Sequence, residues 1–181
     1  MHAPTHALLS WLVAETVPSL ERRDRMLVLA AGLVPDLDAL TILGGFEAYQ
    51  KWHRMIFHNG LSAVAFAAFA AVLARRRLAA ALLALGAFHL HLLCDVIGSA
   101  GPDGSIWPVP YLVPFDRREE HFIAWSGQWG LASWQNVTIT LVALVACGVL
   151  GVRRRRTIVE AFSLAADLAV VETLRARFSR S

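Results

Sequence analysis

The 181-residue sequence is short of charged residues, of lysine and of cysteine. Only 17% of its residues are Asp, Glu, Lys or Arg, against about 25% in soluble globular domains, and Lys51 is the only lysine. A disordered chain or a nucleic-acid-binding arm needs more charge than this. The two cysteines both lie inside apolar runs, which excludes a disulfide scaffold. What is left is a folded, apolar protein for which no nucleic acid is expected as a partner.

Apolar residues are what the sequence has in excess. They make up 56% of the chain, and the mean hydropathy is +0.51. Five apolar segments are short against the roughly 20 residues of a typical transmembrane helix, and they cover residues 4–20, 26–43, 60–74, 78–97 and 137–152. The sequence therefore predicts an all-α integral membrane bundle of about five short helices with a long outer loop. A soluble helical protein with buried core helices is the alternative.

Clusters of arginine predict the orientation of these helices. They lie at residues 22–25, 75–77 and 153–156. If the first helix runs inward, all three clusters fall on one side, which the positive-inside rule makes cytoplasmic. We therefore expect a multi-pass protein of the bacterial inner membrane, with the loop 98–136 outside. Residues 157–181 predict an amphipathic tail on the inner surface or on a partner, following a membrane-embedded domain of residues 1–156.

Several ionisable residues lie within or beside the apolar segments, where they are costly and usually functional. Four segments contribute them: they are His6, Asp36, Asp38, His53, His58, His89, His91 and Asp95. At about 1.5 Å per helical residue, most of them lie about 16 to 27 Å from the nearest arginine cluster. This depth is the outer half of a hydrocarbon core about 30 Å thick. The pattern predicts one shared site toward the extracytoplasmic face.

The spacing along the fourth segment gives the strongest local signal. His91 and Asp95 are four residues apart, so both lie on one helical face and can bind one ion or bridge two. His89 lies about 200° around the helix from His91, which excludes it from the same set of ligands.

Two other pairs need a change of backbone direction before both members can reach one site. Asp36 and Asp38 turn inward together only if Pro35 breaks the helix, which its missing N–H and its ring favour. His53 and His58 share a site only if the chain turns between them, with the next helix starting at residues 59–60.

Nitrogen and oxygen ligands without a thiolate favour an open, hydrolytic metal site over a closed structural zinc site. Zinc is the first choice of divalent metal, with manganese or iron as alternatives, and the number of ligands allows one to three ions. For any one of these residues alone, a hydrogen-bonded core histidine or a water-facing carboxylate is the alternative. The predicted ligands are His6, Asp36, Asp38, His53, His58, His91 and Asp95.

Together these motifs resemble the bacterial membrane-bound metal-dependent hydrolases of the YdjM family. The matching elements are His6, the run from Gly32 to Asp38, the pairs His53/His58 and His91/Asp95, and Trp107-Pro108. The ligand order is also similar to that of the zinc-dependent phospholipase C group, which implies phosphoester hydrolysis. One departure is that the usual His-Arg-x-x-Thr-His-Ser reads His-Arg-Met-Ile-Phe-His-Asn here.

The residues and the resemblance together predict a hydrolase in which metal-activated water attacks an ester or phosphoester at the outer membrane interface. Its expected partners are membrane lipid and a small-molecule or lipid substrate. Asp36 or Asp38 is the candidate base, and Arg54 either binds a phosphate oxygen or pairs with an aspartate. Residues 119–121 of the outer loop are further candidates that the sequence leaves open.

Two functions of other classes compete with this hypothesis. An ion or proton transporter is one, because intramembrane His and Asp residues also build relays. A non-catalytic membrane scaffold that binds a regulatory partner through its tail is the other.

Overall fold

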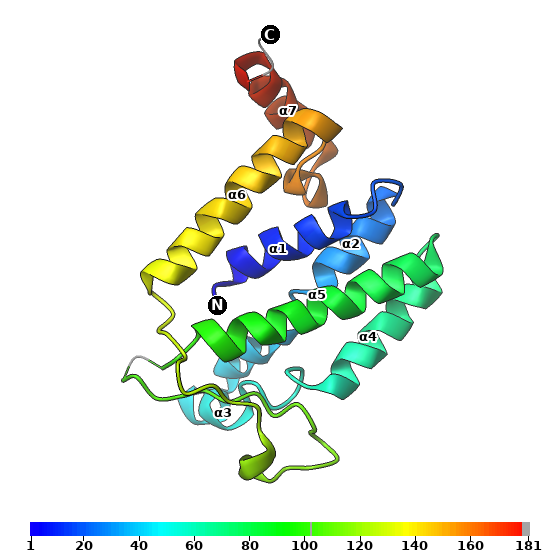
Figure 1. Cartoon of the computed structure of the whole chain (residues 1–181). Coiled ribbons are helices and arrows are strands. Elements are labelled where there is room, and N and C mark those ends of the chain that lie inside the picture. The colour runs from blue at the N-terminus through cyan, green and yellow to red at the C-terminus, as the bar shows by residue number, and fades with distance from the viewer. Residues whose placement is uncertain (102, 179–181) are drawn as a thin grey trace.

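The chain folds into helices joined by one long loop (Figure 1). The computed structural model describes residues 1–101 and 103–178, and throughout these ranges the regular elements are helical. The α-helices are α1 (Ala3–Glu15), α2 (Arg22–Ala31), α3 (Phe46–Trp52), α4 (Gly60–Leu73), α5 (Arg77–Gly98), α6 (Trp134–Arg154) and α7 (Leu164–Phe178). Three 3-10 helices accompany them: η1 (Pro35–Gly44), η2 (Glu119–His121) and η3 (Ile158–Ala161). The predicted all-α class is confirmed.

Local sequence explains where the helices begin and break. The Asn59 side chain accepts a hydrogen bond from Ser62 N at 2.9 Å and caps α4, as the sequence predicts. The second apolar segment is broken: α2 ends at Ala31, η1 begins with Pro35, and the two axes are bent by 58°. The break predicted at Pro35 is therefore present.

Two helices, α5 and α6, are long and apolar enough to cross a membrane. The bent pair α2 and η1 adds a third if it is counted as one span, and α4 is an apolar helix of shorter length. Helix α1 has 13 residues, fewer than the 17 or so needed for a span. The crossing of the membrane by all five segments stays a prediction.

Helix α5 lies at the centre of the packing, where it contacts α1, α2 and α4, while α1 also packs against α6 (Figure 1). Alanines fill many of these contacts, including Ala31, Ala84 and Ala87, which are fully buried or nearly so. Small side chains let helix backbones approach closely. The close packing brings the last turns of α5 next to the start of α1 and to the break between α2 and η1.

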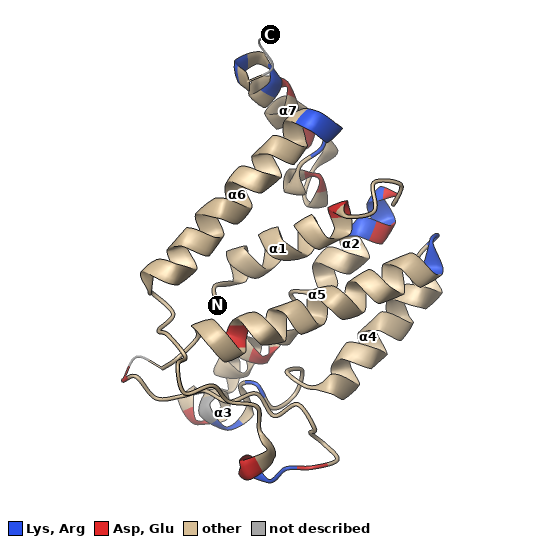
Figure 2. Cartoon of the chain, in the orientation of Figure 1, with Lys and Arg blue, Asp and Glu red and all other residues tan. Residues whose placement is uncertain are grey.

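A buried to half-buried ionic network joins the helices at the opposite end of the bundle. The network consists of Glu15, Arg25, Arg154, Arg156 and Glu160, and we call it the arginine network. Arg25 donates to both oxygens of the Glu160 carboxylate, at 2.6 and 2.5 Å, and Glu15 accepts from Arg154 and from Arg156, both at 2.8 Å. The three arginine clusters thus gather at one end of the helices, as predicted (Figure 2). Which side of the membrane this end faces stays a prediction.

The segment after α6 is fixed to the bundle at its base. Glu160 of η3 belongs to the arginine network, and Asp167 of α7 accepts from the backbone N–H and the hydroxyl of Thr157. Large apolar side chains on this segment are exposed, among them Phe162 and Leu168. The location of the predicted tail on the inner membrane surface stays a prediction, and its residues 179–181 lie outside the described residues.

Candidate metal centre

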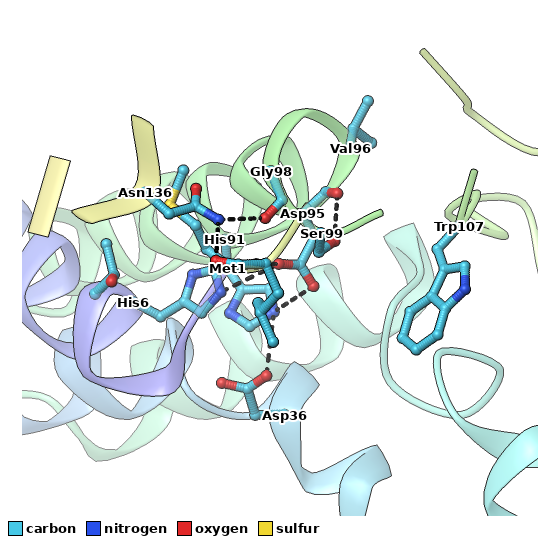
Figure 3. A network of polar contacts seen from close by, with 12 residues as sticks. Met1, His6, Asp36, His91, Asp95, Val96, Gly98, Ser99, Trp107 and Asn136 are labelled. Carbon is cyan, nitrogen blue, oxygen red and sulfur yellow. Dashed lines mark hydrogen bonds and ion pairs between the residues drawn. The ribbon is translucent and has the colours of Figure 1, made fainter. Parts of the chain in front are cut away.

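Histidines from three parts of the chain meet around one carboxylate (Figure 3). Asp95 is 4% exposed. Its Oδ1 lies 3.2 Å from His6 Nε2, and its Oδ2 lies 3.4 Å from His58 Nε2 and 3.6 Å from His91 Nε2. The three histidines come from α1, from the turn before α4 and from α5. The convergence predicted for these residues is present.

Hydrogen bonds on the far side of two rings fix which nitrogen faces Asp95. Nδ1 of His91 lies 2.8 Å from the carbonyl oxygen of Gly32. Because a carbonyl only accepts, this Nδ1 carries the proton, and in the neutral ring Nε2 keeps its lone pair. Nδ1 of His58 lies 3.0 Å from Asp38 Oδ2, and the same reasoning leaves its Nε2 free. A histidine that ligates a metal is held by its second nitrogen in the same way.

The buried ring nitrogens lack hydrogen-bond partners. Among the described residues, this holds for Nε2 of His6, His58 and His91, and all three side chains are about 1% exposed. A buried polar atom left unpaired is costly and calls for an explanation. Three lone pairs around a buried carboxylate fit a bound divalent cation, which would satisfy all of them.

The side chains form two candidate ligand groups that share one histidine. His58, His91 and Asp95 make one group, and His6, Asp36 and His91 make the other, with the ligand atoms of each within 4.8 Å of one another. Two such groups are compatible with one ion or with a pair of ions. The amino group of Met1 also forms an ion pair with Asp95 (Figure 3), so a positive group lies against this carboxylate.

The two aspartates of η1 occupy different positions. Asp38 is fully buried, and its oxygens accept from Phe57 N, at 3.0 and 3.2 Å, and from His58 Nδ1. It therefore faces the back of His58 and lies in neither candidate ligand group. Asp36 faces His91 Nε2 at 3.8 Å, and its side chain is 30% exposed. Its Oδ2 has no hydrogen-bond partner in the described part of the chain.

His53 lies beside the ligand groups and belongs to neither. Its ring stacks on Tyr49 at 4.5 Å and meets the rings of His58 and Trp107 edge-on, at 5.9 and 5.8 Å. The turn predicted between His53 and His58 is present, but it directs His53 toward the cavities described below. Burial, together with the nearby His58 and Arg54, lowers the pKa of His53 to about 4.

Arg54 connects the ligand groups with the outer loop. Its side chain is buried and forms an ion pair with Asp95 Oδ2 at 3.4 Å. It also donates to the carbonyl oxygen of Trp107 at 2.7 Å and to the hydroxyl of Ser99. The predicted pairing with an aspartate is thus present. Its Nε has no hydrogen-bond partner among the described residues.

Sequence reasoning missed one residue of the outer loop, Gln128. Its amide nitrogen donates to the carbonyl oxygens of Asp95 and Trp107, at 2.8 and 3.2 Å, and its amide oxygen accepts from Trp107 N at 2.8 Å. Gln128 therefore holds the loop against the end of α5, and we call these contacts the outer-loop latch. A single glutamine 33 residues from its partner gives no signal in a sequence.

Two cavities adjoin the ligand groups and share Tyr49, His53, Arg54 and Trp107 in their walls. The inner cavity, of about 540 Å³, is also lined by Asp36 and Asp95. The outer cavity, of about 770 Å³, extends toward the loop. Both are of the size that takes a small organic ligand.

The remaining candidates lie away from the ligand groups. Both ring nitrogens of His89 have other neighbours, the carbonyl oxygen of Leu85 and the hydroxyl of Tyr111, each at 2.8 Å. His121 contacts Asp116 at 2.6 Å on the outer loop. Arg118 and His121 hold the pKa of the Asp116 carboxyl well below its usual range. Among residues 119–121, only Glu119 is placed at a described cavity, in the wall of the outer one.

Comparison with known proteins gives one match. The family model described as YdjM inner membrane protein covers residues 1–177, which include every residue of the candidate metal centre. The chain matches no curated protein and no solved structure. The chain belongs to the YdjM inner membrane protein family.

Proposed function

We propose that this protein is a membrane-bound, metal-dependent hydrolase. The observation that carries the proposal is the set of three buried, unpartnered Nε2 atoms, among the described residues, around the carboxylate of Asp95. His6, His58, His91 and Asp95 would hold a divalent metal, with zinc as first choice and manganese or iron as alternatives. When bound, the metal would polarise an ester or phosphoester and lower the pKa of an attacking water.

The protein's own groups have separate tasks in this proposal. Asp38 and the carbonyl of Gly32 keep the protons of His58 and His91 on Nδ1, which leaves Nε2 for the ion. Asp36 has a partly exposed carboxylate in the wall of the inner cavity, so it is the candidate general base that accepts a proton from water.

A substrate from the membrane fits the family and the geometry. The chain belongs to a family of inner membrane proteins. His6 lies near the start of α1 and Glu15 at its end, so the candidate metal centre and the arginine network lie at opposite ends of this helix. If the arginines are cytoplasmic, the protein is multi-pass and its centre opens toward the extracytoplasmic face. An ester or phosphoester of a membrane lipid would then reach the inner cavity from the bilayer surface.

A transporter is the less favoured alternative because it needs polar groups through the whole thickness of the membrane. Residues 67–74, 78–86 and 142–149 contain no Asp, Glu, His, Lys or Arg. These parts of α4, α5 and α6 offer no relay of charged side chains between the centre and the arginine network.

The first experiment measures metal. The wild type, His91→Ala and Asp95→Ala are purified in detergent, and their metal content is determined by mass spectrometry. His89→Ala is the matched control, because His89 lies on the same helix and has its partners outside the ligand groups. We expect bound metal in the wild type and in the control and its loss in the other two variants. Negligible metal in all four proteins would refute the proposal.

The second experiment measures hydrolysis. Bis-p-nitrophenyl phosphate and p-nitrophenyl butyrate serve as phosphoester and carboxylic ester probes. We expect turnover of at least one probe that a chelator abolishes and that Asp36→Asn lowers about 10²- to 10⁴-fold, the usual contribution of a general base. Turnover unaffected by chelation would contradict metal dependence.

A further inference from the structure

The outer cavity is amphipathic. Its walls include the aromatic and apolar side chains Phe46, Met55, Trp107 and Phe122. Such walls bind hydrocarbon or ring systems by excluding water from them. The cavity is therefore suited to an apolar part of a ligand.

Charged side chains of mostly one sign accompany these walls. Lys51, Arg54 and Arg117 line the outer cavity, and Glu119 is the carboxylate among its lining residues. Lys51 and Arg117 are exposed, whereas Arg54 is 5% exposed. In a chain with only 17% charged residues, three cations around one apolar cavity favour an anionic ligand group.

Arg54 also lines the inner cavity, so it belongs to the walls of both spaces. Its Nε and the Nδ1 of the adjacent His53 are buried and, among the described residues, have no hydrogen-bond partner. The Nε of Arg54 always carries a proton, so this buried donor indicates a missing acceptor. Nδ1 of His53 is a second donor in the tautomer that protonates it. An anionic oxygen at the junction of the cavities would supply this acceptor.

We propose that the ligand of these joined cavities is an anionic lipid amphiphile. Its chain lies in the outer cavity against Trp107 and Phe122, and its anionic headgroup lies among Lys51, Arg54 and Arg117. The bond to be cleaved then points into the inner cavity, toward Asp36 and Asp95. This inference rests on the proposed function, because it names the class of substrate that the same site would bind.

Binding tests this inference without turnover. The protein is placed in nanodiscs of phosphatidylcholine, with and without added zinc, and empty nanodiscs provide the background. Three radiolabelled probes are compared: 1-oleoyl-lysophosphatidate, the neutral 1-monooleoylglycerol, and glycerol 3-phosphate, which lacks the chain. We expect lysophosphatidate to bind about tenfold or more tighter than either of the other two probes, also in the absence of zinc.

Variants of the exposed cations locate the headgroup while leaving the buried Arg54 in place. We expect Lys51→Gln together with Arg117→Gln to weaken the binding of lysophosphatidate about three- to tenfold and to leave monooleoylglycerol unchanged. Arg118→Gln is the matched control, because Arg118 is exposed on the same loop and pairs with Asp116 at 2.7 Å.

Equal affinity for lysophosphatidate and monooleoylglycerol would overturn the anionic headgroup. Glycerol 3-phosphate binding as tightly as lysophosphatidate would overturn the role of the apolar cavity and indicate a site for a free phosphate. Either result leaves metal binding and hydrolysis intact as separate measurements. Failure of this inference and failure of the proposed function are therefore distinguishable.

Discussion

Replacing Asp38 by Asn tests whether the orientation of His58 sets the affinity for metal. The Asp38 carboxylate accepts from Phe57 N at both oxygens and from His58 Nδ1 at Oδ2. An asparagine keeps one acceptor oxygen and presents two N–H donors in place of the other. One of the two neighbours must therefore face a donor.

Both orientations of the new amide have a consequence. If its oxygen stays on His58 at the Oδ2 position, it keeps the 3.2 Å contact with Phe57 N. The amide nitrogen then replaces Oδ1, and the 3.0 Å hydrogen bond from Phe57 N is lost, which costs about 1–3 kcal/mol. If the amide turns, its nitrogen meets His58 Nδ1 and moves the ring proton to Nε2, the atom that faces Asp95. Loss of such an orienting partner lowers metal affinity about 10- to 100-fold, or about 1.4–2.8 kcal/mol.

Competition with a chromogenic zinc chelator measures this affinity for the wild type and for Asp38→Asn, and circular dichroism shows whether the variant is folded. Asp103→Asn is the matched control, because Asp103 is exposed and its carboxylate contacts Ser105 on the outer loop. A folded Asp38→Asn protein with wild-type zinc affinity would refute the argument that Asp38 positions a ligand.

Three other substitutions test parts of the structure that support the centre. Gln128→Leu removes the outer-loop latch, so we expect full metal content with probe hydrolysis lowered about 10- to 100-fold by misplacement of the cavity wall. Glu160→Gln breaks a buried ion pair of the arginine network, so the free energy of unfolding should fall by about 3–5 kcal/mol while metal content is retained. Gly32→Ala would place its Cβ 1.7 Å from Ser10 Oγ, so we expect lost metal, with partial recovery on adding Ser10→Gly.

Each of these substitutions has a control of the same type. Gln135→Leu on α6 is the control for Gln128→Leu. Glu47→Gln, at an exposed position of α3, is the control for Glu160→Gln. Gly86→Ala is the control for Gly32→Ala, because among the described residues a Cβ at Gly86 meets no heavy atom within 4 Å apart from its chain neighbours and its own helix backbone. Three results would contradict this reasoning: metal loss in Gln128→Leu, unchanged thermal unfolding in Glu160→Gln, and wild-type metal content in Gly32→Ala.

Local rules explain the part of the fold and site that could be predicted. The ring and missing N–H of Pro35 disrupt a helix interior, although they are tolerated in a first turn, and Asn59 is a good cap before any helix. The spacing of His91 and Asp95 places them on one face of whatever helix contains them. The arginine clusters likewise gather at one end because charge avoids the apolar interior.

The roles of Asp36 and Asp38 depended on a detail that the sequence did not contain. On an α-helix, residues two apart diverge by about 160°, whereas on a 3-10 helix such as η1 they diverge by about 120°. The smaller angle lets both carboxylates reach the centre from different sides, Asp36 toward His91 and Asp38 toward the back of His58. The assignment of Asp38 to the back of His58 depends on a contact between residues 20 positions apart in the sequence.

The partners behind the ligands were harder still to predict. A backbone carbonyl such as that of Gly32 is present at every residue and has no sequence signature. Glu15 and Glu160 are acidic residues near helix ends, and only the fold shows that they are buried against arginines. Long-range pairing of this kind is decided by packing, which a single sequence does not display.

The break between α2 and η1 also decides where one backbone carbonyl is directed. In a continuous α-helix, the oxygen of Gly32 would accept from the N–H of Asp36. Here the N–H of Asp36 turns instead to Leu33 O at 3.1 Å, and the Gly32 oxygen is released to accept from His91. The backbone conformation near Pro35 and the tautomer of a histidine 59 residues away are therefore coupled. In a sequence that kept this helix straight, the Gly32 oxygen would no longer accept from His91, and the His91 ring would lose the hydrogen bond that orients it. No candidate ligand would have changed.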